Sequence, residues 1–493
     1  MHHCLSVEEV VRLITCELID ATEYETAAAL ARCKKSFENP VLDVLWESQC
    51  RLVPLLETFP GDIWSPGDES FRRLPTTQEW SHMRKYARRM RHLEEDAIVD
   101  VVSPQVLSVL QFRASSEPLF PNLQSFILCD TRGGLIPFIP LFLSPRTTAF
   151  TIFSYSGANL PRAVTASMIA ALPTLCPNLQ RIRLYHLPTD PIIAAAVSEL
   201  LFTTNLKTLS DFHANFPLVE EAREVIYKLP GLRRFQTRIS GPTTVPTMVL
   251  PNLVRLEIEY DCGHDWLQGF RGASLGKLAS VWINTKSDSI GDFLKAFECV
   301  ALTTSIPATL LTFRLHTVRE WRPNYHHLLP FTQLETLVIH FSCKLGCPST
   351  IDDDTIVHLA RAIPNLTTLQ FGLRPCRTAA GVTPKGLSAL ALYCLHLSEL
   401  RIHFRAASFD PPTMPGFIPS DCTVPREVCA LTNLDVGDIP IPDKFALMVA
   451  LTLTRIFPCL KWIDYSDGRW REVAMAIGIS NELADYSRQR AAL

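Results

Sequence analysis

The stretch at residues 177–184 reads PNLQRIRL, and it decides the fold because its pattern returns along most of the chain. The same opening occurs as PNLQSFIL at 121–128, PNLVRLEI at 251–258 and PNLTTLQF at 364–371. In each copy a leucine is followed, three and five residues later, by apolar residues. This alternation is typical of a short β-strand that buries one face.

Fourteen copies of the pattern follow one another between residues 107 and 465. The first and last starts are 353 residues apart, so the 13 intervals average about 27 residues. Amphipathic helices are predicted before several copies, at 165–176, 354–363 and 384–394. Because one strand and one helix cannot bury their shared apolar side alone, the units must stack. The leading residues are Leu107, Leu123, Thr147, Leu179, Leu206, Leu232, Leu253, Leu278, Leu310, Leu334, Leu366, Leu397, Leu431 and Leu460.

These copies resemble leucine-rich repeats. The patterns C-x-x-L-x-x-I-x-L at 176–184 and C-x-x-L-x-x-L-x-I at 394–402 are similar to the cysteine-containing subclass of that family. The resemblance implies an α/β fold, an irregular leucine-rich-repeat solenoid over residues 101–470, with a C-terminal helical cap or tail at 471–493. A closed α/β barrel is the alternative architecture, and it would need eight regular strand–helix units.

Residues 1–48 have a different, helical pattern. Apolar residues recur at helical spacing over 5–14 and 25–35, and a run that ends in Leu45-Trp46 closes the segment. The segment resembles an F-box, although the usual Leu-Pro opening of that family is Leu5-Ser6 here. The resemblance implies a small all-α module that docks on a Skp-type adaptor, and through it on a cullin ubiquitin ligase. The expected adaptor-binding residues are Leu5, Val10, Ile14, Leu30, Cys33, Phe37 and Trp46.

Residues 49–100 are predicted to form a helical linker or N-terminal cap, with one helix at 77–93. The W-x-x-x-x-x-Y-A-R-R stretch that begins at Trp80, the F-box-like helices and the uneven repeats together resemble the large F-box/leucine-rich-repeat-like families of mushroom-forming fungi. The linker helix also carries a basic cluster, which fits either a phosphate-binding or nuclear-localisation patch or a solvated helix face neutralised by residues 94–96. We favour the solvated face for Arg84, Lys85, Arg88, Arg89 and Arg91.

Composition restricts the classes of partner. Lys and Arg number 47 against 50 Asp and Glu, a net charge of −3, so binding of nucleic acid through bulk positive charge is not expected. The most apolar run, at 133–145, is short and interrupted by prolines, and the N-terminus lacks the apolar core of a signal peptide. We therefore expect a cytoplasmic or nuclear protein without a membrane partner, whose 15 cysteines are reduced and act as small core residues.

The sequence offers no convincing catalytic, cofactor or metal site. Three consecutive aspartates at 352–354 could bind a cation, but a helix N-terminus explains them better. The Cys-Gly-His-Asp stretch at 262–265 is expected to be a loop, since nucleophilic catalysis needs convergence in space. Phosphate-binding glycine loops and hydrolase motifs are not found. We therefore expect no enzyme, no cofactor and no metal.

Two functions remain, and both are non-catalytic. The first is a substrate receptor of a Skp–cullin–F-box type ubiquitin ligase, in which the F-box docks the adaptor and the solenoid binds the substrate. The alternative is a leucine-rich-repeat scaffold or inhibitor without a link to ubiquitin. Residues between the buried strand positions should form the concave face, which begins at Arg113 and binds an acidic or phosphorylated peptide unless it is an ordinary solvated strand face. The expected substrate-binding residues are Arg181, Arg183, Tyr185, Arg234, Arg238, Arg255 and Trp282.

Overall fold

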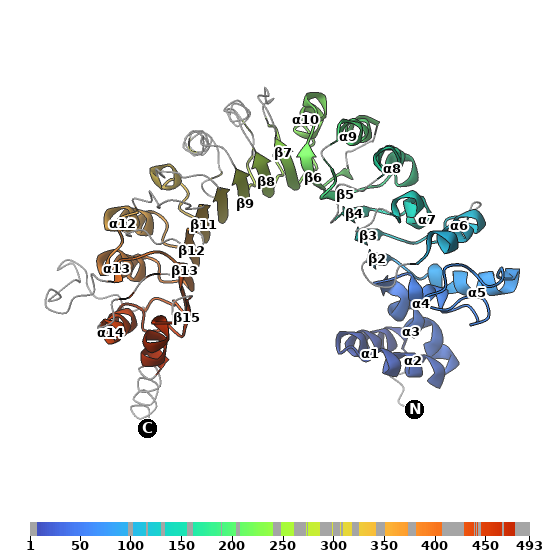
Figure 1. Cartoon of the computed structure of the whole chain (residues 1–493), viewed down its shortest axis with the longest axis horizontal. Helices are drawn as coiled ribbons and strands as arrows, with labels where there is room; N and C mark the ends of the chain where they lie inside the picture. Colours follow the sequence, from blue (N-terminus) through green and yellow to red (C-terminus); the bar gives the residue numbers. More distant parts are fainter. Residues whose placement is uncertain are drawn as a thin grey trace. The chain divides into compact units, whose positions relative to one another are not determined.

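The chain forms two compact units, residues 1–232 and 233–493 (Figure 1). The boundary falls within the repeats, at a place that no composition shift marks. In this computed structural model the described residues are 7–96, 102–114, 117–129, 134–154, 161–188, 190–203, 208–239, 248–260, 273, 275–285, 298, 306, 309–317, 325–341, 351–372, 381–406, 428–437, 439, 441, 445–465 and 468–478. Cys343 and Cys347, the two cysteines closest in sequence, and the stretch 262–265 lie outside them.

The first unit begins with a module of three helices, α1 (Glu8–Asp20), α2 (Tyr24–Cys33) and α3 (Lys35–Glu47). All three helices contact one another, and they bury a small core of Val11, Ala31, Phe37 and Val41. The helical prediction for this segment is confirmed, with α1 extending six residues beyond the predicted end. We refer to α1–α3 as the N-terminal module.

Six strands follow the chain order in the first unit, each parallel to the next. Helices α6 to α10 lie along one side of these strands in Figure 1. The strands are β1 (Ser48–Gln49), β2 (His92–Asp96), β3 (Ser125–Cys129), β4 (Ala149–Phe153), β5 (Arg181–Tyr185) and β6 (Asp211–Pro217), and the helices between them are α4 (Val53–Leu56), α5 (Thr77–Ala87), α6 (Pro104–Arg113), α7 (Ile139–Phe142), α8 (Arg162–Leu175), α9 (Pro191–Thr203) and α10 (Glu220–Ile226).

The second unit continues the same plan with nine strands in chain order. Helices α12 to α14 lie along one side of its later strands (Figure 1). The strands are β7 (Arg234–Ile239), β8 (Arg255–Tyr260), β9 (Ser280–Thr285), β10 (Thr312–Thr317), β11 (Thr336–Phe341), β12 (Thr368–Phe371), β13 (Glu399–Arg401), β14 (Asn433–Gly437) and β15 (Trp462–Tyr465), and the helices are α12 (Asp353–Ala362), α13 (Pro384–Tyr393) and α14 (Ala446–Ile456).

This architecture confirms an α/β fold of stacked strand–helix repeats. Twelve of the fourteen predicted copies supply a strand at the expected place, from Leu123 to Leu460. Among the described residues, six strands of one unit and nine of the other follow the chain order, which excludes the regular eight-unit barrel that the sequence left open.

Two predicted copies are wrong. Leu107 is a buried residue of helix α6 and starts no strand. The copy expected from Leu206 lies three residues later: β6 buries Phe212 and Ala214, so Leu209 is its leading residue. Because a strand's side chains alternate between its faces, this shift of three residues moves Asp211 from a predicted buried position to the opposite face.

Strand β2 was not predicted from the sequence. Helix α5 ends at Ala87, and the chain then forms β2, so the predicted helix over 77–93 is too long. In the pattern of the other repeats, Leu93 and Glu95 occupy the two buried positions, and Glu95 accepts a 2.7 Å hydrogen bond from the backbone N–H of Leu52. The repeat was not recognised in the sequence because Glu95 lies at a strand position that is apolar in the other repeats. Residues 49–100 therefore contribute the first two strands, and they are more than a helical linker.

Two buried cysteines connect successive repeats through weak hydrogen bonds. The Cys394 thiol donates to the carbonyl of Ile363 at 3.7 Å, and the Cys429 thiol donates to the carbonyl of Cys394 at 3.5 Å. Burial raises the pKa of Cys394 to about 12 and that of Cys429 to about 11, so both stay protonated. Cys176, Cys394 and Cys429 are free and buried, as expected of small core residues, whereas Cys16, Cys33 and Cys50 are free but exposed, so the core placement is wrong for them.

Two of the three aspartates at 352–354 bond to the first turns of helices, and the third forms an ion pair with Lys385. The Asp352 side chain accepts from the Thr355 backbone N–H at 2.9 Å, and its bonds to Thr355 lower the pKa of Asp352. Asp353 reaches the next repeat, where it accepts from the backbone N–H groups of Thr383 at 2.8 Å and Gly386 at 2.9 Å. A Cβ at Gly386 would stand 2.6 Å from the Asp353 carboxylate, which explains the glycine. These contacts favour the capping interpretation of the sequence over the cation site.

Changing Asp353 to alanine is expected to lower the free energy of unfolding by about 1–3 kcal/mol, because it leaves two partly buried N–H donors of the next repeat without their acceptor. Urea denaturation followed by circular dichroism measures the loss. Asp354→Ala is the matched control, since that side chain is exposed and its ion pair with Lys385 spans 3.3 Å. Equal losses in the two variants would contradict the inter-repeat role.

Candidate functional site

Helix α1 exposes apolar side chains. The buried face of the helix carries Val11 and Thr15, which point into the N-terminal module. On the other side, Leu13 is 66% exposed and Ile14 is 37% exposed, and Val7 is also exposed just before the helix. Isolated exposed apolar residues are common, but neighbours on one short helix form a patch that suits a protein partner. We call Val7, Leu13 and Ile14 the α1 patch.

The seven residues predicted to bind the adaptor are placed in different environments. Ile14 and Cys33 are exposed, and Val10 and Leu30 are half-buried. Phe37 is only 3% exposed because it fills the module's core, and the Trp46 ring is half-buried against Tyr86 of α5, 4.9 Å between centroids. Leu5 lies outside the described residues.

On the first unit, the predicted basic face is largely neutralised. We use the term open strand face for the alternating strand positions that the helices do not cover. Arg181 is exposed there, but Arg183 forms an ion pair with the buried carboxylate of Asp211 on the neighbouring strand. The Tyr185 ring stacks on Phe153 with 4.2 Å between centroids, and the tilted ring of His213 lies 3.8 Å from it on the next strand. Arg183 and Tyr185 therefore contact neighbouring strands of the sheet, and their part in binding a partner stays a prediction.

Arg113 needs a correction. It is the last residue of helix α6, so it lies on a helix end and not on a strand face. Its assignment followed from the copy at Leu107, which is helical. The seven predicted substrate-binding residues then divide between the units: three are on β5, and Arg234, Arg238, Arg255 and Trp282 are on β7 to β9.

On the second unit, the open strand face mixes both signs of charge. Arg234 and Arg255 are exposed and opposite each other in register, while Arg238 is opposite Glu259. Trp282 is 44% exposed, between Glu257 on one neighbouring strand and Arg314 on the other. The aromatic anchor predicted at Trp282 is therefore presented to solvent.

Trp282 borders a cavity of about 420 Å³ that runs across β9 to β13. The side chains in it combine an aromatic ring, a guanidinium, two imidazoles, an amide and the carboxylate of Glu399, and such a mixture of apolar and polar groups is typical of a binding pocket. The imidazole Nδ1 of His316 lies 3.1 Å from the Asn284 amide oxygen, and Nε2 of His340 lies 3.3 Å from that of Gln370. The main lining residues are Trp282, Arg314, His316, Val338, His340 and Gln370.

Both histidines of this cavity are held uncharged at neutral pH. Burial lowers the pKa of His316, and burial together with the positive charges of Arg401 and Arg314 lowers the pKa of His340. At neutral pH the positive charge of the cavity is therefore carried by Arg314, and the imidazoles serve as neutral hydrogen-bonding groups.

Stability of the second unit is expected to fall as pH drops below the ordinary histidine pKa of 6.5, because the unfolded chain then binds protons more readily than the folded one. A His316→Asn/His340→Gln variant should lose less stability over the same range. Thermal unfolding at a series of pH values measures this. A variant with an unchanged profile would contradict the assigned burial.

Comparisons with known proteins leave the family open. No protein-family model matches the chain, and no curated protein matches it. Among the described residues, no group of three or more His, Cys, Asp or Glu side chains is placed to hold a metal ion. In the same part of the chain, no helix has the length and apolar character needed to cross a bilayer.

Proposed function

We propose that this protein is a non-catalytic substrate receptor of a Skp–cullin–F-box type ubiquitin ligase. In this proposal the N-terminal module is the F-box and the strand–helix repeats are an irregular leucine-rich-repeat solenoid. The α1 patch is the observation that carries the proposal. Leu13 and Ile14 remain exposed although the module has a core of its own, as expected for a surface that a partner covers.

The attachment of the module to the repeats supports a role as a connector. Trp46 packs on Tyr86, and Asp43 of α3 pairs with Arg89 just after α5. These contacts fix the module on the first unit through α3, while the α1 patch stays accessible. A ligase receptor needs such a fixed arrangement, because it acts by raising the effective concentration of substrate near the ubiquitin-loaded enzyme.

The substrate surface that we favour is the cavity beside Trp282. Exposed Trp and Arg side chains are the residues that most often contribute strongly to protein interfaces. Arg314 lies between Trp282 and Val338 in register, so a carboxylate or phosphate on the substrate could pair with the guanidinium while the substrate's apolar atoms contact the flanking side chains. We favour this site over Arg183 because the charge of Arg183 is already balanced by Asp211.

A scaffold or inhibitor without a ubiquitin ligase is the second candidate. One observation favours it: α3 turns Trp46 inward against α5, as a simple cap of the repeats would. A cap, however, does not require an exposed apolar patch on α1. The α1 patch is therefore the feature that distinguishes a ligase receptor from a scaffold.

The experiment mixes the purified full chain with a purified Skp-type adaptor and separates the mixture by size-exclusion chromatography. We expect a stable one-to-one complex at micromolar concentrations. Separate elution of the two proteins would favour the scaffold. The full chain is the right material, since deletion of the module would also uncover Tyr86 and disturb the repeats themselves.

A further inference from the structure

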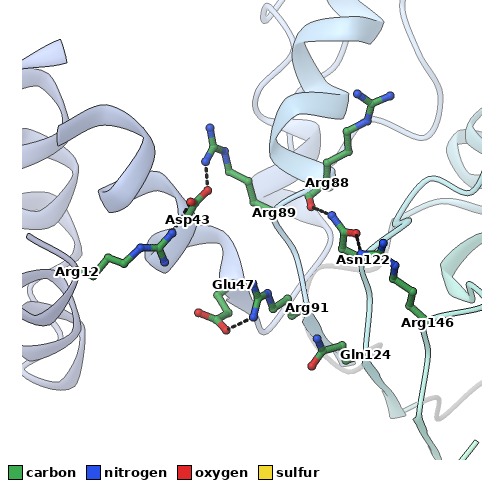
Figure 2. Close-up of a pocket in the computed structure, with 9 residues that line it drawn as sticks. All are labelled: Arg12, Asp43, Glu47, Arg88, Arg89, Arg91, Asn122, Gln124 and Arg146. Atoms are coloured by element: carbon green, nitrogen blue, oxygen red, sulfur yellow. Dashed lines mark hydrogen bonds and ion pairs between the residues drawn. The ribbon is translucent and has the colours of Figure 1, made fainter. Parts of the chain in front are cut away.

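The first unit holds a cavity of about 300 Å³ whose walls are entirely charged or amide side chains (Figure 2). It lies where the N-terminal module meets the amino ends of strands β2 to β4. Arg12 comes from α1, Arg91 directly precedes β2, Gln124 precedes β3, and Arg146 precedes β4. Neither the adaptor surface nor the substrate surface proposed above includes these residues.

Backbone hydrogen bonds fix the far wall of this cavity. The carbonyl of Arg91 accepts from the backbone N–H groups of Gln124 at 2.7 Å and Ser125 at 3.0 Å. The backbone N–H of Arg91 donates to the carbonyl of Glu47 at 2.8 Å, which ties the same segment to α3. Side chains from distant parts of the sequence are therefore held around one space before any ligand arrives.

Positive charge exceeds negative charge around this space. Five arginines line the cavity against two carboxylates. Asp43 is shared, since it pairs with Arg12 at 2.6 Å and also with Arg89. Glu47 is the other carboxylate, and it lies 3.6 Å from Arg91, too far for a good hydrogen bond.

The remaining two arginines differ in direction. The Arg88 guanidinium lies 3.6 Å from Glu117, and Figure 2 shows it directed away from the other sticks. Arg146 donates to the neutral amide oxygen of Asn122 at 2.7 Å. Arg91, Arg146 and the Gln124 amide are exposed and are the groups best placed to bind an anion.

The basic cluster was expected to form a solvated helix face, and the helical placement is wrong for three of its members. Helix α5 ends at Ala87, so Arg88, Arg89 and Arg91 lie in the segment between α5 and β2. The expected neutralisation by Glu95 also fails, because that carboxylate is buried and accepts from Leu52.

We propose that the cavity binds a small anion that carries at least two phosphate groups. Guanidinium groups bind phosphate oxygens through paired, charge-assisted hydrogen bonds, and the Gln124 amide adds a neutral donor. The volume is at the lower end of the range for small-molecule pockets. A phosphorylated peptide is less suited, because every lining side chain is charged or an amide and none offers apolar contact to neighbouring residues of a peptide.

Such an anion would connect the N-terminal module to the repeats. It would contact Arg12 on the module and Arg91 or Arg146 at the strand starts, so binding should stabilise the folded first unit. This effect requires no adaptor and no substrate, and its test is therefore independent of the proposed ligase function.

The test is titration of the full chain with sodium pyrophosphate by isothermal titration calorimetry, together with thermal unfolding. We expect binding at one site, an affinity that falls as sodium chloride is added, and a higher unfolding temperature with ligand. Absence of binding at low ionic strength would overturn the proposal.

Variants then locate the site. Arg91→Gln/Arg146→Gln should bind pyrophosphate about tenfold or more weakly, because each substitution removes a charged donor. Arg113→Gln is the control; it removes one positive charge from an exposed position outside the cavity and should bind as the unmodified chain does. Equal affinity in the double variant and the control would contradict the assignment.

Two further measurements keep the outcome decisive. Gln124→Glu adds a carboxylate to the wall without removing an arginine, and it should weaken binding even if the double variant fails to fold. A phosphoserine peptide serves as the competing class of ligand. If the peptide bound about tenfold more tightly than pyrophosphate, and lost this affinity in the same variants, the small-molecule assignment would be overturned in favour of a phosphoprotein.

Discussion

Replacement of Leu337 by alanine is expected to lower the free energy of unfolding of the second unit by about 2–5 kcal/mol. Leu337 is fully buried on strand β11 and lies in register between Phe313 and Leu369 of the neighbouring strands. Truncation removes apolar contacts from two repeats at once and leaves a cavity that these large neighbours can fill only in part. Urea denaturation followed by circular dichroism measures the loss.

Leu311→Ala provides the matched control for this substitution. Leu311 directly precedes strand β10 and is 39% exposed, so its truncation should change the free energy of unfolding by no more than about 0.5 kcal/mol. A loss below about 1 kcal/mol for Leu337→Ala would mean that the strand register is wrong, since a shift of one residue would move Leu337 to the opposite face.

The strands could be predicted because their signal is local. A leading leucine and two alternating apolar residues report burial within six residues, and the stacking of repeats follows from the need to cover each apolar face. The prediction failed where a polar residue lies at a buried strand position. It also failed where two nearby leucines could each be the leading residue of the strand pattern. Glu95 is the first case, since its acceptor role for Leu52 depends on a residue 43 positions away; the copy placed at Leu206 instead of Leu209 is the second.

The functional surface depends on tertiary pairing, which the sequence does not report. Arg183 looks like a free cation in the sequence until the register of β5 and β6 places Asp211 near it. Helix α1 carries apolar residues on two faces, and only packing against α3 decides that Val11 is buried while Leu13 is exposed. Trp282 was predicted correctly as exposed because it stands between two strong buried positions of its strand.

The second large effect is expected at the α1 patch. Leu13→Asp/Ile14→Asp should weaken binding of a Skp-type adaptor by about 100-fold or more, because apolar residues at an interface centre commonly contribute about 2 kcal/mol each or more. Both side chains are exposed in the free chain, so the substitutions should leave the fold intact. Circular dichroism and thermal unfolding of the variant check this directly.

Leu447→Asp is the control for the charge and the lost apolar surface. Leu447 is an exposed leucine on helix α14 of the second unit, and its substitution makes one such apolar-to-acidic change on a different surface. We expect this variant to bind the adaptor as tightly as the unmodified chain. Similar weakening in both variants would indicate nonspecific apolar association.

The dissociation constant of the full chain for a purified Skp-type adaptor, measured by isothermal titration calorimetry beside these two variants, tests the receptor proposal most directly. The expected result is one-to-one binding by the unmodified chain and by Leu447→Asp, with binding lost in Leu13→Asp/Ile14→Asp. If the unmodified chain does not bind the adaptor, or if the double variant binds it with undiminished affinity, the N-terminal module does not dock a ligase through the α1 patch.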